Sequence, residues 1–515
     1  MSPRDTMIVD APCGPVQGIC RPTSHPGSDS WAFFGLPFAQ PPTGPLRFLA
    51  PRLRSPWEQP IDATRPGATA QRHALLDVTT IPEPSIAGDD TLLVNVFTPH
   101  PGRTDARAPV MVWIHGGGYV AGSPSSPWYD GNAFNRDGIV TVSVSYRLGF
   151  DGFGWVDGSD APTNRALLDL IMALTWVRDN IVSFGGDPDN VTVAGHSAGA
   201  ACIHALMATG QAEGLFHAAI CQSPLPITLT VDDSHVTAVH MALAAGIPAT
   251  LDGWCSLSEE TIYSAQQHLI IALGETAQMQ GDADGCNPLT IECPQRSPFG
   301  PVIGDSVLPD HPAAIARTPG HASVPLLIGS TAHEFAGEND TGTNPATTEQ
   351  AAAIASALQT CGWTADDARR FVARWSALRD PRQILNQAIS TEPLVHAPLR
   401  RCLQSRDEGG AATWRYCFQW PWPRQLSQHC FDLPFSFDVH HNPEAQTALV
   451  RFPTDIEPPQ SALTTLHNSF DAPVYDGELD EDSLSMHEDW VYFIRHHSAP
   501  WPRWDPHSAQ VRLYF

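Results

Sequence analysis

The segment Gly195-His196-Ser197-Ala198-Gly199 holds one hydroxyl between two glycines, directly after the apolar run at 191–194. The small residues at 200–207 that follow favour a helix. A sharp turn from strand to helix holds such a serine clear of the backbone, where a base and a substrate can reach it. We therefore expect Ser197 to act as a nucleophile, the alternative being a serine in a purely structural turn.

A second glycine-rich segment, Gly116-Gly117-Gly118, follows His115 at the end of the apolar run 109–114. Glycines leave backbone N–H groups free to point into a cavity because no Cβ stands in the way. Two such groups, with the N–H of Ala198, could hold the negative oxygen of a tetrahedral intermediate. The alternative is a loop that only ends a strand, and we expect His115 to shape that loop rather than to transfer protons.

The charge balance limits the partners of the chain. Its 515 residues hold 29 basic residues, all arginine, against 55 acidic ones, for a net charge of −26. This acidity argues against nucleic acid and against an anionic membrane surface as partners. The absence of lysine excludes a serine–lysine dyad and a Schiff-base lysine.

The cysteine spacing and the N-terminal residues lead us to expect free thiols and a soluble protein. The eleven cysteines show no zinc or disulfide spacing, so we expect free thiols, although Cys286 and Cys293 could bridge a loop. We see no signal peptide and no apolar stretch long enough to span a bilayer, and therefore expect a cytoplasmic protein. The histidine doublets at 440–441 and 496–497 lack the further ligands that a metal site needs.

The sequence pattern predicts which segments form the strands and helices that position these groups. Residues 1–100 read as short strands and turns, whereas 108–225 alternate buried strands with helices such as 166–180. Such alternation predicts an α/β fold with a mainly parallel sheet covered on both faces. Two helical segments, 230–300 and 346–408, read as insertions into this pattern.

Several longer segments carry a family resemblance, namely 35–48, 89–96, 180–192 and the closing stretches near Trp490 and Trp501. Together with the two glycine motifs they resemble the type-B carboxylesterases, the cholinesterase-like branch of the α/β-hydrolase fold. The resemblance runs nearly end to end. It implies a single α/β-hydrolase domain over 1–515, with both insertions roofing the site.

The resemblance also implies the partners of Ser197. Chain order in this fold is serine, acid, histidine, which assigns Glu334 and His429, with Glu338 as the alternative acid and His440 or His441 as the alternative base. It gives the oxyanion donors as Gly117, Gly118 and Ala198, and places Ser223 and His196 beside the triad. It further implies two ion pairs, Arg47 with Asp89 and Arg147 with Asp169.

Four positions depart from the family pattern. His196 stands where the family has glutamate, Thr91 where it has cysteine, and Phe335 and Pro224 where it has glycine. Because Thr91 replaces the cysteine, we expect the corresponding disulfide to be absent. The other three changes alter the pocket and its surroundings, but not the residue types of the triad.

The predicted activity is hydrolysis of a small-molecule carboxylic ester through an acyl-enzyme, with no cofactor and no metal. An imidazole activates the serine, and a carboxylate fixes the tautomer of that imidazole. Three alternatives stay open: an acyltransferase using the same triad, an amide or carbamate hydrolase, and a non-catalytic binding protein with the same fold.

Overall fold

The structure of the chain is a computed structural model. It describes residues 5–514 apart from the following gaps: 24–28, 74–80, 281–296, 319–323, 338–346, 361, 377, 379, 420–425, 440–485 and 509.

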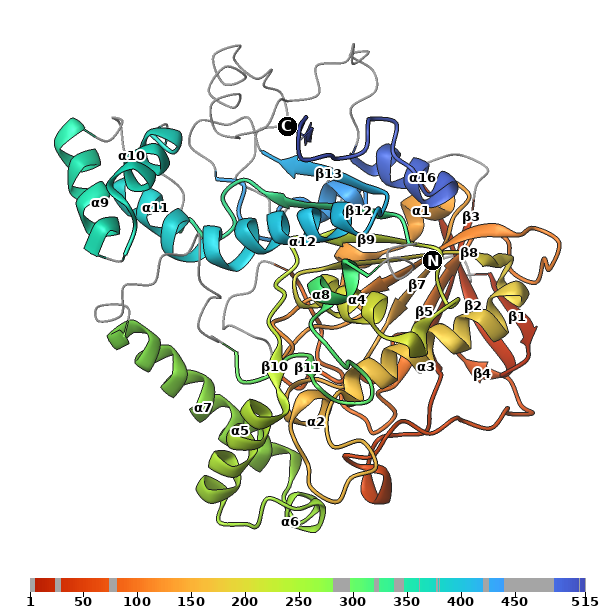
Figure 1. Cartoon of the computed structure of the whole chain (residues 1–515). Helices are drawn as coiled ribbons and strands as arrows, with labels where there is room; N and C mark the ends of the chain where they lie inside the picture. The colour runs from red at the N-terminus through yellow and green to blue at the C-terminus, as the bar shows by residue number, and fades with distance from the viewer. Residues whose placement is uncertain are drawn as a thin grey trace.

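A twelve-stranded sheet runs through the described part of the chain (Figure 1). In spatial order its strands are β1 (Thr6–Ala11), β2 (Gly14–Pro22), β3 (Asp29–Pro37), β5 (Leu93–Thr98), β7 (Val140–Val144), β6 (Ala108–Ile114), β8 (Gly186–His196), β9 (Ala218–Gln222), β12 (Leu326–Thr331), β13 (Thr413–Phe418) and β14 (Arg512–Tyr514), with β4 (Ile61–Asp62) beside β2. The strands from β1 to β7 pair antiparallel and those from β7 to β14 pair parallel. The carboxyl ends of the parallel strands therefore share one edge, where ligand sites of such sheets lie.

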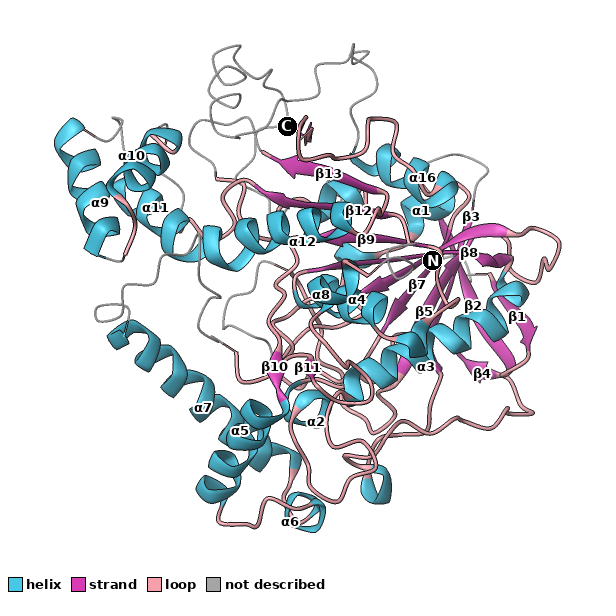
Figure 2. Cartoon of the chain, viewed as in Figure 1, coloured by secondary structure: helices cyan, strands magenta, loops and turns pink. Residues whose placement is uncertain are grey.

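Helices cover both faces of this sheet (Figure 2). The described helices, including those that extend beyond the sheet, are α1 (Asn132–Arg136), α2 (Gly149–Phe153), α3 (Arg165–Asn180), α4 (Ala198–Ala208), α5 (Val231–Ala245), α6 (Leu251–Cys255), α7 (Glu259–Gln280), α8 (Pro312–Ala316), α9 (Thr348–Thr360), α10 (Ala365–Arg374), α11 (Pro381–Asn386), the π-helix η6 (Gln387–His396), α12 (Ala397–Glu408), α13 (Leu433–Ser436) and α16 (Met486–His496). Short 3-10 turns are η1 (Gly44–Leu46), η2 (Pro127–Tyr129), η3 (Ile181–Phe184) and η4 (Gly210–Ala212). No described helix is both long and apolar enough to cross a bilayer.

Strand β6 shows why two helical layers are needed. Alternate side chains of a strand point to opposite faces, so Val110 and Val112 join one apolar core, together with residues of α3 and α4. Met111 and Trp113 join a second core on the other face, with residues of α16. A strand buried on both faces reads as a continuous apolar run, which is how 109–114 appears in the sequence.

Two groups of helices extend from the sheet (Figure 1). One, α5 to α7, lies between β10 (Leu229–Thr230) and β11 (Val302–Ile303), which pair with each other and bring its ends together. The other, α9 to α11, has an apolar cluster of its own that includes Leu358 and Trp375. The α9–α11 group is therefore packed around its own cluster, whereas α5 to α7 contribute Met241, Trp254 and Ile262 to the core that β6 shares with α3 and α4.

The alternating pattern predicted from the sequence is confirmed. Strands β6, β7, β8 and β9 and helix α3 occupy the segments expected for them within 108–225. The antiparallel N-terminal strands agree with the short strands expected over 1–100. The expected α/β fold with a large, mainly parallel sheet is present.

Candidate functional site

Ser197 lies at the sharp turn between β8 and α4. Its backbone has φ 57° and ψ −123°, a conformation that non-glycine residues rarely adopt. Its N–H donates to the carbonyl of Gln222 at the end of β9, with an N–O distance of 2.9 Å. A Cβ at Gly199 would lie 2.2 Å from the carbonyl oxygen of Ile114, so only glycine lets α4 approach β6 this closely. The turn is therefore held from both sides, and such strain is typical of functional positions.

Three residues from distant parts of the chain form a continuous hydrogen-bonded series. The Nε2 atom of His429 lies 2.9 Å from the Oγ atom of Ser197. Its Nδ1 atom lies 2.5 Å from Oε2 of Glu334. Glu334 follows β12 and His429 lies in the loop after β13. The structure thus brings together the predicted serine, base and acid at the carboxyl edge of the sheet.

The Glu334 carboxylate is buried and fully engaged. Its Oε1 atom accepts hydrogen bonds from the Ser223 hydroxyl at 2.6 Å and from the Thr331 N–H at 2.8 Å. Burial alone would raise the pKa of Glu334, but the neighbouring His429 and the hydrogen bonds from His429 and Ser223 outweigh it and lower the pKa. The carboxylate is therefore charged at neutral pH and can stabilise an imidazolium beside it.

The triple-glycine loop lies directly against the nucleophile. A Cβ at Gly116 would come within 3.1 Å of the Ser197 Cβ. Gly117 and Gly118 have φ of +113° and +61°, and a Cβ on Gly118 would meet open space. Among the described residues, the N–H groups of Gly117, Gly118 and Ala198 have no hydrogen-bond acceptor. Gly117 and Gly118 follow Gly116 in the chain and Ala198 follows Ser197, so these three N–H groups remain our candidates for an oxyanion site.

Two aromatic rings flank the imidazole of His429. The ring centroid of Phe335 lies 4.8 Å from it and that of His196 lies 4.5 Å from it. His196 is 1% exposed, and neither of its ring nitrogens has a hydrogen-bond partner among the described residues. Burial, reinforced by His429, holds the pKa of His196 well below its usual value. A neutral imidazole therefore stands where the family pattern has a carboxylate.

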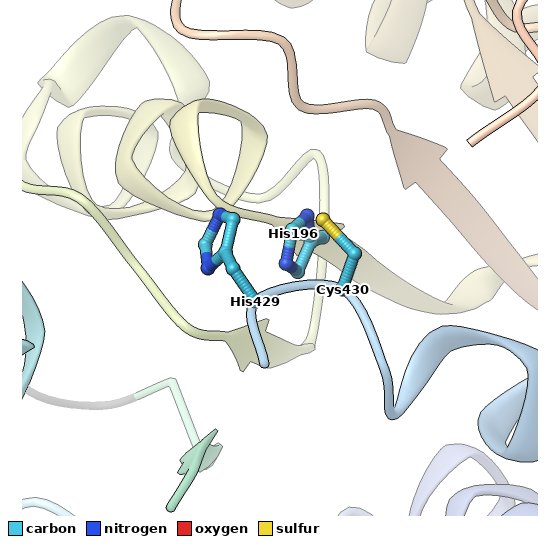
Figure 3. A group of neighbouring side chains, drawn as sticks. All are labelled: His196, His429 and Cys430. Carbon is cyan, nitrogen blue, oxygen red and sulfur yellow. The ribbon is translucent and has the colours of Figure 1, made fainter. Parts of the chain in front are cut away.

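A thiol that the sequence did not single out completes this group. Cys430 directly follows His429, and one ligand atom each from His196, His429 and Cys430 lie within 4.8 Å of one another (Figure 3). Cys430 has a positive φ of +77°, which turns the chain sharply after His429. In the sequence, only the adjacent pair His429-Cys430 could have indicated this cluster. The closeness of these two residues to His196 arises only in the folded chain.

The other histidines near the site are occupied structurally. Nδ1 of His115 makes a 2.8 Å hydrogen bond to the Gly116 carbonyl, and burial lowers the pKa of His115 to about 4. His333 accepts a hydrogen bond from the Ser427 N–H. The alternatives Glu338, His440 and His441 lie outside the described residues, as do Cys286 and Cys293.

One of the two expected ion pairs is present and the other is wrong. Arg147 and Asp169 are buried and make a bidentate contact, with N–O distances of 2.6 and 2.8 Å. Arg47 instead pairs with Asp151 at 3.1 Å, while Asp89 is exposed and makes no ion pair within the described part of the chain. The Arg47 guanidinium turns towards Asp151 because it also packs on the Phe48 ring and donates to the Leu257 carbonyl.

The fold and this serine–histidine–glutamate arrangement define an α/β-hydrolase. Comparison with known proteins agrees: the sequence model of the carboxylesterase family matches residues 5–461, and the chain belongs to that family. It is 36% identical over 334 residues to the para-nitrobenzyl esterase of Bacillus subtilis (strain 168), covering 64% of this chain and 63% of that protein. It is also 36% identical over 340 residues to carboxylesterase 3 of Homo sapiens, covering 64% and 55%.

These matches span less than two thirds of the two curated relatives. A solved structure of a thermophilic PNB esterase is similar over 98% of this chain and 95% of that chain, with a TM-score of 0.72 and 28% identity. The architecture is therefore shared from end to end, beyond the part of the sequence that aligns well.

Proposed function

We propose that this chain is a serine carboxylesterase that hydrolyses small-molecule carboxylic esters through an acyl-enzyme. The observation that carries the proposal is the unbroken series from the Ser197 hydroxyl through His429 to the buried Glu334 carboxylate. Such a series converts a weakly nucleophilic hydroxyl into an effective nucleophile.

Acylation follows from the positions of these atoms. Ser197 Oγ attacks the ester carbonyl as Nε2 of His429 accepts its proton, and Glu334 stabilises the imidazolium that forms. The N–H groups of Gly117, Gly118 and Ala198 receive the negative oxygen of the tetrahedral intermediate. His429 then returns its proton to the leaving alcohol.

Deacylation repeats the same steps with water. His429 takes a proton from a water molecule as the water oxygen attacks the carbonyl carbon of the acyl-serine. The second tetrahedral intermediate then collapses, the bond to Ser197 Oγ breaks, and His429 returns the proton to that oxygen as the acid is released. Every proton in this cycle moves between His429 and a reacting oxygen. The chain's own residues supply all the groups that the reaction requires.

We further propose that residues 1–515 form one domain and that the insertions roof the site. Contacts between η6 and the loop that carries Glu334 support this for the segment 346–408. Thr391 Oγ1 accepts from the Phe335 N–H at 3.0 Å, and Gln387 Nε2 donates to the Ala332 carbonyl at 2.9 Å. A π-helix at this place agrees with the frequent use of such turns near functional sites.

The test combines turnover with labelling. Para-nitrophenyl esters of increasing acyl length should be hydrolysed by the wild type, and Ser197→Ala should reduce kcat by about a thousandfold or more. Ser183→Ala, in the 3-10 turn η3, is the matched control and should retain full activity. A fluorophosphonate should label Ser197, and the variant should resist it. Labelling of a different serine, or turnover that survives Ser197→Ala, would contradict the proposal.

A further inference from the structure

His196, His429 and Cys430 gather ligand atoms of three residues beside the nucleophile (Figure 3). Two of these residues have no part in the proposed hydrolysis. His196 replaces a carboxylate of the family pattern, and Cys430 follows the base directly in the chain. The group is the one place in the described residues where three side chains of metal-binding type come this close.

The state of His196 points to a missing partner. Its side chain is almost completely buried, yet neither ring nitrogen has a hydrogen-bond partner in the described part of the chain. Burying a polar group without a partner is unfavourable, because the group loses its hydrogen bonds to water and gains none in return. A ligand that accepts an imidazole lone pair would recover part of this cost, and the neighbouring imidazole and thiol are themselves lone-pair donors.

The donor set selects the chemistry of that ligand. Two imidazoles and one thiol match the Cys and His ligands of Zn²⁺, and three protein ligands leave one coordination position open. Zinc bond lengths require ligand atoms about 3.3–3.8 Å apart in a tetrahedral site. The atoms here lie within 4.8 Å of one another, so shifts of about an ångström would complete the geometry.

We propose that His196, His429 and Cys430 form a binding site for Zn²⁺ or a similar thiophilic divalent cation, and that an ion bound there switches the enzyme off. Coordination deprotonates the Cys430 thiol, and the proton passes to solvent. No oxidation or reduction takes place. The site is inhibitory rather than catalytic, which separates it from the metal-free hydrolysis proposed above.

Inhibition follows from the hydrogen bonds of His429. Nδ1 is held by Glu334 and Nε2 by Ser197, so both ring nitrogens already serve the triad. A cation that takes either nitrogen breaks one of these two bonds. Loss of the Ser197 contact removes the base, and loss of the Glu334 contact removes the group that orients it. Metal binding and turnover are therefore mutually exclusive.

The binding test does not depend on the esterase activity, although the inhibitory effect rests on the proposed function. Metal-free protein is titrated with Co²⁺, which gives an intense thiolate-to-cobalt absorption band when cysteine is a ligand. We expect this band in the wild type and its loss in Cys430→Ser. The matched control is Cys255→Ser, because Cys255 is a free, exposed thiol away from the site, and this variant should keep the band.

The inhibition test uses Zn²⁺ and para-nitrophenyl acetate, with each variant compared with its own metal-free rate. The wild type should lose activity reversibly, and a chelator should restore it. The Zn²⁺ concentration for half-inhibition should rise by about a hundredfold or more in Cys430→Ser and His196→Gln, since even a residue that only supports a ligand is worth 10–100-fold. Cys255→Ser should be inhibited like the wild type.

Three results would overturn the inference: no thiolate–cobalt band in the wild type, a band that persists in Cys430→Ser, or equal Zn²⁺ inhibition of all variants. A band without any inhibition would refute the switch. If the protein lacked esterase activity, the proposed function would fail, whereas the Co²⁺ titration would still decide whether the site exists.

Discussion

Ser223 donates its hydroxyl proton to one oxygen of Glu334, at 2.6 Å, while the other oxygen of the same carboxylate faces His429. Ser223 directly follows β9 and has a positive φ of +45°, and its N–H donates to the Gly329 carbonyl of β12. The serine is thus fixed by two strands, and it fixes the acid in turn. We therefore propose that Ser223 is a positioning residue that acts through Glu334.

Ser223→Ala should lower kcat for ester hydrolysis by about tenfold and leave KM nearly unchanged. A hydrogen bond to a charged group is worth about 1.5–3 kcal/mol, and part of that should appear as weaker stabilisation of the imidazolium. Steady-state kinetics over a pH series gives the measurement, with Ser223→Thr to test rescue by a hydroxyl. An unchanged kcat in the alanine variant would show that Glu334 is held well enough without it.

Glu334→Gln should reduce kcat by about a thousandfold to ten-thousandfold, because an amide no longer selects the productive tautomer of His429. The side-chain shape is conserved, so the fold should persist, which circular dichroism can check. Glu338→Gln is the matched control, since Glu338 is the alternative acid that the sequence allows. A large loss in that control, with activity retained in Glu334→Gln, would reverse the assignment.

The two glycines that we propose as oxyanion donors, Gly117 and Gly118, should respond differently to alanine. A Cβ on Gly117 would lie 2.1 Å from the carbonyl oxygen of Ala121, whereas on Gly118 it would meet nothing within 4 Å. We expect Gly117→Ala to disturb the loop and to destabilise the protein. Gly118→Ala should cost only about 1–2 kcal/mol of backbone strain, yet reduce kcat because that strain shifts the N–H group that we propose as an oxyanion donor.

Thermal unfolding and steady-state kinetics of both variants separate these effects. The Gly118 variant is informative because its fold should survive. Full activity in Gly118→Ala, in a protein with near-native stability, would argue against a role for this part of the loop in binding the oxyanion.

Local patterns in the sequence predict much of this architecture. The Gly-x-Ser-x-Gly segment between an apolar run and small residues indicates the turn at Ser197, and the strand β8 and the helix α4 lie on its two sides. Buried parallel strands give continuous apolar runs, so 109–114 and 191–194 are easily recognised. The spatial order, in which β6 lies between β7 and β8, needs long-range pairing that no local pattern reveals.

Contacts that depend on side-chain direction escape sequence reasoning. The family resemblance implied an ion pair between Arg47 and Asp89, but the Arg47 guanidinium pairs with Asp151. It is held there because it also packs on the Phe48 ring and donates to the Leu257 carbonyl. Cys430 and His196 are far apart in the chain, and nothing in their spacing indicates that they meet. The resemblance to relatives identified Glu334 and His429, since their separation in the sequence carries no signal of its own.

Asp169→Asn should destabilise the protein by about 3–5 kcal/mol, because it leaves the buried Arg147 guanidinium without its counter-charge. Asp151→Asn breaks the ion pair with Arg47, in which the Asp151 side chain is 30% exposed and the Arg47 side chain 15%. Because this pair is partly exposed to solvent, its loss should lower the free energy of unfolding by less than about 1 kcal/mol. Urea unfolding of both variants gives the comparison. Equal losses would show that burial does not distinguish the two pairs.

Asp432→Asn should make stability less dependent on pH. Asp432 is buried, and burial, reinforced by Glu334, raises its pKa from 3.8 to about 6 although Tyr416 and Gln222 donate to it. A folded-state pKa above the unfolded one means that its stabilising contribution is complete below about pH 4 and is lost as pH rises through 6. The difference between these two pKa values corresponds to about 3 kcal/mol. The free energy of unfolding of the variant, relative to the wild type, should therefore rise by about 2 kcal/mol between pH 4.5 and 7.5.

Urea unfolding at several pH values measures this difference in the free energy of unfolding, with the exposed Asp366→Asn as the control for losing a surface carboxylate. A difference that stays constant over this range, or falls, would show that Asp432 does not bind its proton more tightly in the folded state.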